Sequence, residues 1–165
     1  MTRKSSSPSS DLPLSGFTYS RALFQQMVED ALAEAKKVGA SDAAVEVSEG
    51  GGLSVSVRLG ELENVERNRD KALGVSVYVG QRRGNASTSD FSPAALRSTV
   101  EAAYNIARFT ADDDAAGLAE EELLEKHPQD LQLYHPWTID AEAAVEIARA
   151  AEAADIAIQY AVALG

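Results

Sequence analysis

The sequence predicts an α+β domain in which an antiparallel sheet of about five strands, connected as a meander, is flanked by helices on one face. Apolar residues recur at helical spacing from Ser20 to Val38 and again from Ser92 to Ala107. Between these segments, apolar and polar residues alternate twice, as they do in half-buried strands. The expected strands follow one another closely, and a parallel crossover would need roughly a dozen residues, so antiparallel neighbours are favoured.

The first expected helix runs from Ser20 to Val38 and has a signal at each end. Thr18 or Ser20 can cap its start, and Gly39 supplies the left-handed residue that often ends a helix. A strand is expected at residues 43–48. The Gly50-Gly51-Gly52 run that follows predicts a hairpin turn.

The next four strands are expected between residues 53 and 91. The clearest is residues 53–59, where leucine and valine alternate with serine and arginine. The others are a polar strand at 62–69 after a turn at Gly60-Glu61, an alternating strand at 73–79 after a turn at Asp70-Lys71, and a strand of small polar residues at 84–91 after a turn at 81–83.

The C-terminal half is expected to be helical, with one irregular stretch. Ser92-Pro93 marks a helix start, because proline suits the first turn. Residues 109–137 are acidic and contain prolines, with a short helix expected near 118–126. Asp140 caps a last, alanine-rich helix from Ala141 to about Ala154.

We expect three segments along the chain. Residues 1–19 are rich in serine and poor in apolar residues, which predicts a disordered tail. Residues 20–155 form the domain, and residues 156–165 are an atypical apolar ending. No apolar run is long enough to span a bilayer and no signal-peptide core is present, so we expect a cytoplasmic protein without membrane attachment.

Composition excludes several classes of function. The chain has no cysteine, which excludes a disulfide scaffold, a thiol nucleophile and thiolate zinc sites. Its formal net charge of −11 arises entirely after residue 83, where 15 acidic residues face four basic ones. An acidic surface repels phosphate backbones, so direct binding of nucleic acid is not expected.

No catalytic set is visible in the sequence. His127 and His135 are each followed by a proline in a segment expected to be irregular, and their spacing matches no known ligand motif. Residues 112–114 are three aspartates without the turn glycine of a calcium loop, which is typical of a solvated charge run. We therefore expect no catalytic residue and no metal ligand in this chain.

Two expected strands, residues 61–69 and 84–90, have almost no apolar face. Such a strand lies at the edge of a sheet, or lines a wet cavity or an interface, and periodicity does not separate these cases. The candidate contacts for a peptide or a partner protein are the polar residues of these strands: Glu63, Asn64, Glu66, Arg67, Arg69, Asn85, Ser87 and Ser89.

A family resemblance covers about residues 20–154. It is carried by residues 52–110, GLSVSVRLGELENVERNRDKALGVSVYVGQRRGNASTSDFSPAALRSTVEAAYNIARFT, and by residues 130–154, DLQLYHPWTIDAEAAVEIARAAEAA. Both stretches resemble the N-terminal domain of the PmbA/TldD family. The GELENVE strand and the GNASTSDFSP turn are more similar to the PmbA (TldE) branch than to TldD.

The resemblance implies a cytosolic metallopeptidase system, also named a modulator of DNA gyrase, that processes microcin precursors and other peptides or unfolded proteins. It implies a heterodimer with a TldD-type subunit, or self-association, and places zinc on the HExxxH motif of that partner. No position of this chain matches the motif, so no cofactor is expected here.

The resemblance also predicts that this chain has a scaffolding or chamber-forming role and is inactive alone. Family chains continue into a large C-terminal domain of the catalytic type, whereas residues 155–165, DIAIQYAVALG, run on as apolar sequence and stop. The alternative hypothesis is a non-enzymatic interaction module that binds a partner protein directly.

Overall fold

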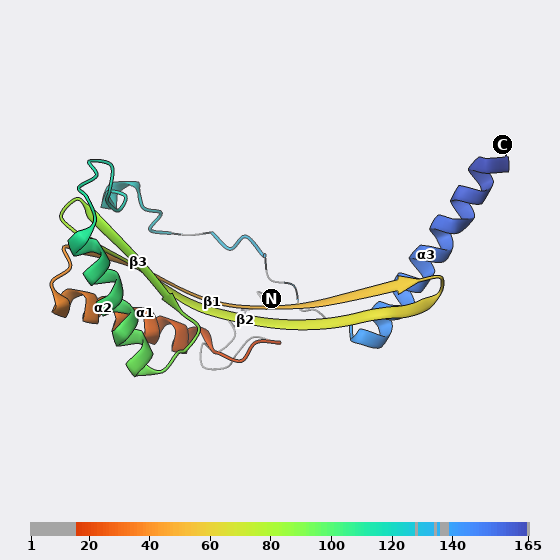
Figure 1. Cartoon of the computed structure of the whole chain (residues 1–165), viewed down its shortest axis with the longest axis horizontal. Coiled ribbons are helices and arrows are strands. Elements are labelled where there is room, and N and C mark those ends of the chain that lie inside the picture. Colours follow the sequence, from red (N-terminus) through yellow and green to blue (C-terminus); the bar gives the residue numbers. More distant parts are fainter. Residues whose placement is uncertain (1–15, 128, 134, 136–138, 165) are drawn as a thin grey trace, which may run out of the picture. The chain divides into compact units, whose positions relative to one another are not determined.

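The computed structural model describes residues 16–127, 129–133, 135 and 139–164. Its elements follow the order α1 (Arg21–Val38), β1 (Asp42–Arg58), β2 (Glu61–Val79), β3 (Arg82–Thr88), α2 (Pro93–Phe109), the 3-10 turn η1 (Glu121–Leu123) and α3 (Ala141–Leu164) (Figure 1). These elements form two compact units. The first unit contains residues up to Gly50 and from Asp70 to Leu133, and the second unit contains 51–69 and 134–165.

The sheet has three strands in the order β1-β2-β3 among the described residues. β2 and β3 are antiparallel, and their register pairs Leu73 with Thr88 at one end and Val79 with Arg82 at the other. The predicted α+β class is therefore confirmed, but the expectation of five strands is wrong. Two long strands replace four short ones.

The strand count differs because two predicted turns are extended. Residues 50–52 lie inside β1 and have no positive φ, although glycine permits one, and Asp70-Lys71 lies inside β2. The chain reverses instead at Leu59-Gly60, with φ angles of 54° and 78°, and at Gly80, with φ of 61°. Residues in the left-handed conformation give a tight hairpin turn the same twist as the two strands that it connects.

The helix α1 has the ends that the sequence predicts. The Ser20 side chain accepts a hydrogen bond from the Leu23 backbone N–H at 3.2 Å, and Gly39 ends the helix with φ of 96°. The face of α1 that carries Met27, Ala31 and Ala35 is buried.

In the first unit, α1 and α2 cover one face of the sheet. Figure 1 shows the two helices beside each other and against the strands. The core there includes Leu73, Val75 and Val77 from β2 and Val100 from α2, all of them fully or nearly fully buried. The alternating residues that predicted the strand thus point toward the helices.

Helix α2 packs unusually close to β3 at Gly84. A β-carbon added at this buried glycine would overlap the carbonyl oxygen of Ala103 and the backbone nitrogen of Ala107. Both neighbours are backbone atoms, which cannot rotate out of the way. Gly84 therefore sets the distance between α2 and the sheet.

The second unit is the β1–β2 hairpin end together with α3. The carboxylate of Glu152 accepts hydrogen bonds from the backbone N–H groups of Leu59, at 2.6 Å, and Gly60, at 2.7 Å. The Arg149 Nε donates to the carbonyl of Gly60 at 3.0 Å. We call these contacts the Glu152 clamp. They hold a turn whose Leu59 is in the left-handed region and 82% exposed.

Two predictions about the C-terminal half need correction. The helix expected near residues 118–126 is only the three-residue η1, and α3 continues well beyond Ala154, to Leu164. Residues 155–164, DIAIQYAVAL, contain no glycine or proline, so nothing in this sequence breaks the helix. The expected disordered tail lies, up to residue 15, outside the described residues. None of the described helices is long and apolar enough to cross a membrane.

Candidate functional site

The polar strand predicted from the sequence is the first part of β2. All its side chains from Glu61 to Arg69 are exposed, so this segment gains almost nothing from burial. Side chains alternate along a strand, which places Glu63, Arg67 and Arg69 on one face and Asn64 and Glu66 on the other. β3 pairs with β2 only from Leu73 onward, so the sheet offers its edge here.

The ion pair between Arg58 and Glu63 in the hairpin is weak. Arg58 Nη1 lies 4.0 Å from Glu63 Oε1, and both side chains are more than half exposed. An exposed pair at that distance contributes little to stability. The segment is held by its backbone pairing to β1 and by the Glu152 clamp at its tip.

The remaining predicted residues lie on β3, in the first unit. Asn85 and Ser87 are exposed on the sheet face turned away from the helices, next to a shallow hollow of about 440 Å³, and Ser89 follows the strand. Ser76 Oγ donates to Asn85 Oδ1 at 2.7 Å across the two strands. The structure therefore assigns the predicted contacts to separate units, five on β2 and three at β3.

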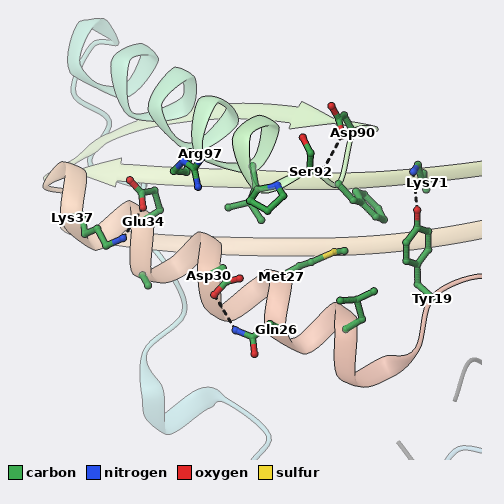
Figure 2. Close-up of a pocket in the computed structure, with 15 residues that line it drawn as sticks. Tyr19, Gln26, Met27, Asp30, Glu34, Lys37, Lys71, Asp90, Ser92 and Arg97 are labelled. Atoms are coloured by element: carbon green, nitrogen blue, oxygen red, sulfur yellow. Dashed lines mark hydrogen bonds and ion pairs between the residues drawn. The ribbon is translucent and has the colours of Figure 1, made fainter. Parts of the chain in front are cut away.

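A larger hollow, which the sequence did not reveal, lies between α1 and the start of α2. This groove has a volume of about 730 Å³ and lies entirely within the first unit (Figure 2). Acidic residues of α1 and basic residues of α2 and β2 share its lining. The charged residues of its lining include Asp30, Glu34, Lys37, Lys71, Asp90 and Arg97.

Lys71 lies at one end of the groove among aromatic rings. Its ammonium is 4.8 Å from the centre of the Phe91 ring and 5.2 Å from that of Tyr19, and it donates to the Tyr19 hydroxyl at 2.9 Å (Figure 2). Cations are attracted to the faces of such rings. Tyr19, Phe24 and Phe91 also contact one another, with ring centres 5.2 to 6.2 Å apart.

Asp90 is the groove residue with a shifted pKa. The backbone N–H of Ser92 donates to its carboxylate at 2.8 Å, and this bond, with the Ser92 side chain and the nearby charge of Lys71, holds the pKa of Asp90 below its ordinary value. Ser92 also caps α2, since its Oγ accepts from the Ala95 N–H. Asp90 thus stays ionised and orders the entry into the helix.

The α1 side of the groove carries its own local pairs. Gln26 donates to Asp30 at 2.9 Å, and Lys37 pairs with Glu34 at 2.9 Å (Figure 2). Arg97 extends from α2 into the same groove. The arrangement can hold charged groups of either sign.

The described residues do not suit a metal ion. They contain no group of three or more histidine, aspartate or glutamate side chains close enough to bind one. Within the aspartate run, Asp112 pairs with Arg82 at 3.1 Å and Asp113 accepts from the Ala115 N–H at 3.0 Å.

Only charge spacing could have revealed the groove from the sequence. Asp30, Glu34 and Lys37 recur at three- and four-residue intervals on one face of α1, which indicates an exposed polar stripe. Nothing local relates this stripe to Asp90 or Arg97, because tertiary packing of α1 against α2 brings them together.

Comparison with known proteins gives related sequences over most of the chain. Residues 43–107 match the family described as PmbA/TldA metallopeptidase domain 1. The chain is 52% identical over 130 residues to a protein named metalloprotease PmbA homolog from Haemophilus influenzae, covering 79% of this chain and 29% of that protein. It is 47% identical over 135 residues to metalloprotease PmbA from Escherichia coli O157:H7, covering 81% and 30%. The chain thus spans less than a third of the length of these curated relatives.

Two solved structures share the fold. One is a putative modulator of DNA gyrase from Bacteroides thetaiotaomicron, with a TM-score of 0.59 and 23% identity over 64% of this chain and 24% of that one. The other is TldE from Thermococcus kodakarensis, with a TM-score of 0.52 and 17% identity over 62% and 23%. At these identities the likeness concerns the fold alone.

Proposed function

Because this chain belongs to the PmbA/TldD family, we propose that it acts as the first domain of a PmbA-like, TldE-type subunit in a metallopeptidase complex. The observation that carries the proposal is the 52% identity over 130 residues to a PmbA homolog named as a metalloprotease. The domain has a scaffolding role there, and the zinc belongs to a TldD-type partner subunit.

The exposed polar residues of β2 and β3 provide the contacts. Glu63, Asn64, Glu66, Arg67 and Arg69 meet a partner subunit or an extended peptide along the β2 edge, where backbone N–H and C=O groups can pair with another strand. A second contact surface is formed at β3 by the residues Asn85, Ser87 and Ser89.

The complex hydrolyses peptides, and by family resemblance its substrates include microcin precursors. The name modulator of DNA gyrase, carried by the Bacteroides protein of similar fold, fits a complex that degrades a gyrase-directed peptide or protein. In this scheme the present domain helps to enclose the substrate and takes no part in bond cleavage.

A domain exchange tests this function. Residues 20–154 of this chain replace the matching part of the Haemophilus influenzae PmbA homolog, and the chimera is co-expressed with the TldD-type subunit of that bacterium. We expect the chimera to co-purify with that subunit and to support peptide hydrolysis at roughly the natural rate, because the exchanged sequences are 52% identical over 130 residues.

The control for the exchange is a subunit that lacks the domain, which should lose both properties. A folded chimera that neither binds the TldD-type subunit nor supports hydrolysis would contradict the proposal. Capture of an unrelated protein by the chain, in cells without any TldD-type subunit, would instead favour the non-enzymatic interaction module.

A further inference from the structure

The groove between α1 and the start of α2 has the size and the lining of a binding site. Its volume is about 730 Å³, and binding pockets of this size are mostly apolar with a few polar groups. Its lining includes the apolar residues Leu23, Met27, Pro93 and Leu96 together with six charged side chains. Leu23 is 43% exposed, so an apolar ligand side chain would remove part of its surface from water.

The groove is elongated, because its lining follows α1 from Tyr19 to Lys37. A helix rises about 27 Å over this number of residues, which is the length of roughly eight residues of extended chain. Figure 2 shows Tyr19, Met27, Asp30, Glu34 and Lys37 spread along this length. An extended peptide therefore matches the groove better than a compact small molecule does.

The acidic side chains of the groove already have partners. Glu34 accepts a hydrogen bond from Lys37 Nζ at 2.9 Å, and Asp30 accepts one from the Gln26 amide at 2.9 Å. Asp90 accepts from a backbone N–H at the start of α2 at 2.8 Å. A basic ligand would therefore compete with an existing partner at each acid.

Two basic side chains of the groove are less satisfied. Arg97 has no hydrogen bond or ion pair with a described residue, so its guanidinium donors are open to a ligand. Lys71 donates to the Tyr19 hydroxyl at 2.9 Å and has no ion pair with a described carboxylate. Hydrogen bonds between such cations and carboxylates are strong ones. The groove therefore offers two cationic groups to a ligand that carries carboxylates.

We propose that this groove binds an extended acidic peptide, with one peptide carboxylate on Arg97, another at Lys71, and an apolar peptide side chain against Leu23. The proposal rests on the proposed function in taking peptides as the substrate class. It adds a binding site lined by α1 and α2 that shares no residue with the contacts proposed on β2 and β3. Side chains recognise the peptide here, whereas an open strand edge recognises its backbone.

The overall charge of the chain opposes such a ligand at long range. The formal net charge is −11 and repels an acidic peptide. Physiological salt screens exposed charges beyond about 8 Å, whereas the contact with Arg97 is direct. Local attraction therefore decides binding, and reversing the charge of one arginine is a sharper test than changing the salt concentration.

Fluorescence anisotropy tests the proposal on the full 165-residue chain. The probe is a fluorescein-labelled peptide of about eight residues, in which two leucines follow each glutamate. We expect Arg97→Glu to raise the dissociation constant of this probe at least about tenfold, because an attractive contact becomes repulsive. Leu23→Ser should raise it by roughly threefold or more, because less apolar surface is buried. A peptide with lysine in place of glutamate should bind the unaltered chain at least about tenfold more weakly.

The matched controls make the same chemical changes outside the groove. Arg83→Glu reverses an exposed arginine of β3, and Leu118→Ser alters a leucine that is 45% exposed. Neither residue lines the groove, so both variants should bind the probe as the unaltered chain does. Circular dichroism checks that Arg97→Glu and Leu23→Ser keep their helices.

Three outcomes would overturn the proposal. The glutamate peptide does not bind, the lysine peptide binds equally well or more tightly, or Arg97→Glu and Arg83→Glu weaken binding to the same extent. The second outcome would assign the groove to a ligand of another charge. The domain exchange reports binding to a TldD-type subunit whether or not this groove is used, so failure of the peptide site and failure of the proposed function are distinguishable.

Discussion

At the residue scale, Gly84 and Gly74 differ in the space that the structure leaves for a β-carbon. Gly84 faces the backbone of α2, where a β-carbon has no room, whereas nothing lies within 4 Å of a β-carbon built at Gly74. Both are strand residues without positive φ. Their backbone preferences are therefore alike, and only the surroundings differ.

We predict that Gly84→Ala lowers the free energy of unfolding by about 3 kcal/mol, because α2 must move away from β3. Gly74→Ala is the matched control and should change it by less than about 1 kcal/mol, in the stabilising direction, because alanine restricts the unfolded chain. Urea unfolding followed by circular dichroism measures both. Equal effects of the two substitutions would contradict the close packing at Gly84.

At the element scale, the β1–β2 hairpin depends on α3 for its turn. Leucine is disfavoured in the left-handed conformation that Leu59 adopts. The Glu152 carboxylate compensates by accepting both N–H groups of the turn, and bonds to a charged acceptor are strong ones. The turn and the helix therefore stabilise each other.

We predict that Glu152→Ala speeds hydrogen exchange at the Leu59 and Gly60 amides by about tenfold, as loss of roughly 1.4 kcal/mol implies. Two-dimensional NMR measures this exchange. Asp155→Ala is the control, because that carboxylate lies nearly one turn further along α3 and accepts from the Gln159 side chain at 2.8 Å. Unchanged exchange at Leu59 and Gly60 in Glu152→Ala would show that the clamp does not hold the turn.

Sequence patterns predicted the elements better than their connections. Alternation located the strand at Leu73–Val79, and Ser20 and Gly39 located the ends of α1. Composition placed turns at residues 50–52 and at Asp70-Lys71, yet backbone pairing between two long strands overrides these local preferences. The exposed polar part of β2 could be predicted, because the sequence of residues 61–69 has almost no apolar residues. The groove was not, because it exists only where α1 meets α2.

At the scale of the whole molecule, burial is concentrated in the first unit. Leu73, Val75, Val77 and Val100 are its largest fully buried side chains, while the second unit has Val145 at 9% exposure among its described residues. Regions with few buried contacts open at lower free energy than the core. Each unit therefore has its own stability.

We predict that the amides of residues 61–69 exchange at least about tenfold faster than those of Val75 and Val77 at low protein concentration. Native-state hydrogen exchange with mass spectrometry measures the difference. Uniform exchange across both units would show that they open together.

The continuity of β1 and β2 across both units limits how such a chain can change in length. Each strand passes from one unit to the other without a loop. Deleting one residue between Glu61 and Ala72 would shift the rest of the strand by one position. Every side chain on one side of the deletion would then point to the opposite face of the sheet, although the side chains between Glu61 and Ala72 are themselves exposed. A substitution there leaves the facing of the strand unchanged, whereas an insertion or a deletion preserves it only in even steps matched on both strands. The alternation of the strand thereby fixes the length of the segment.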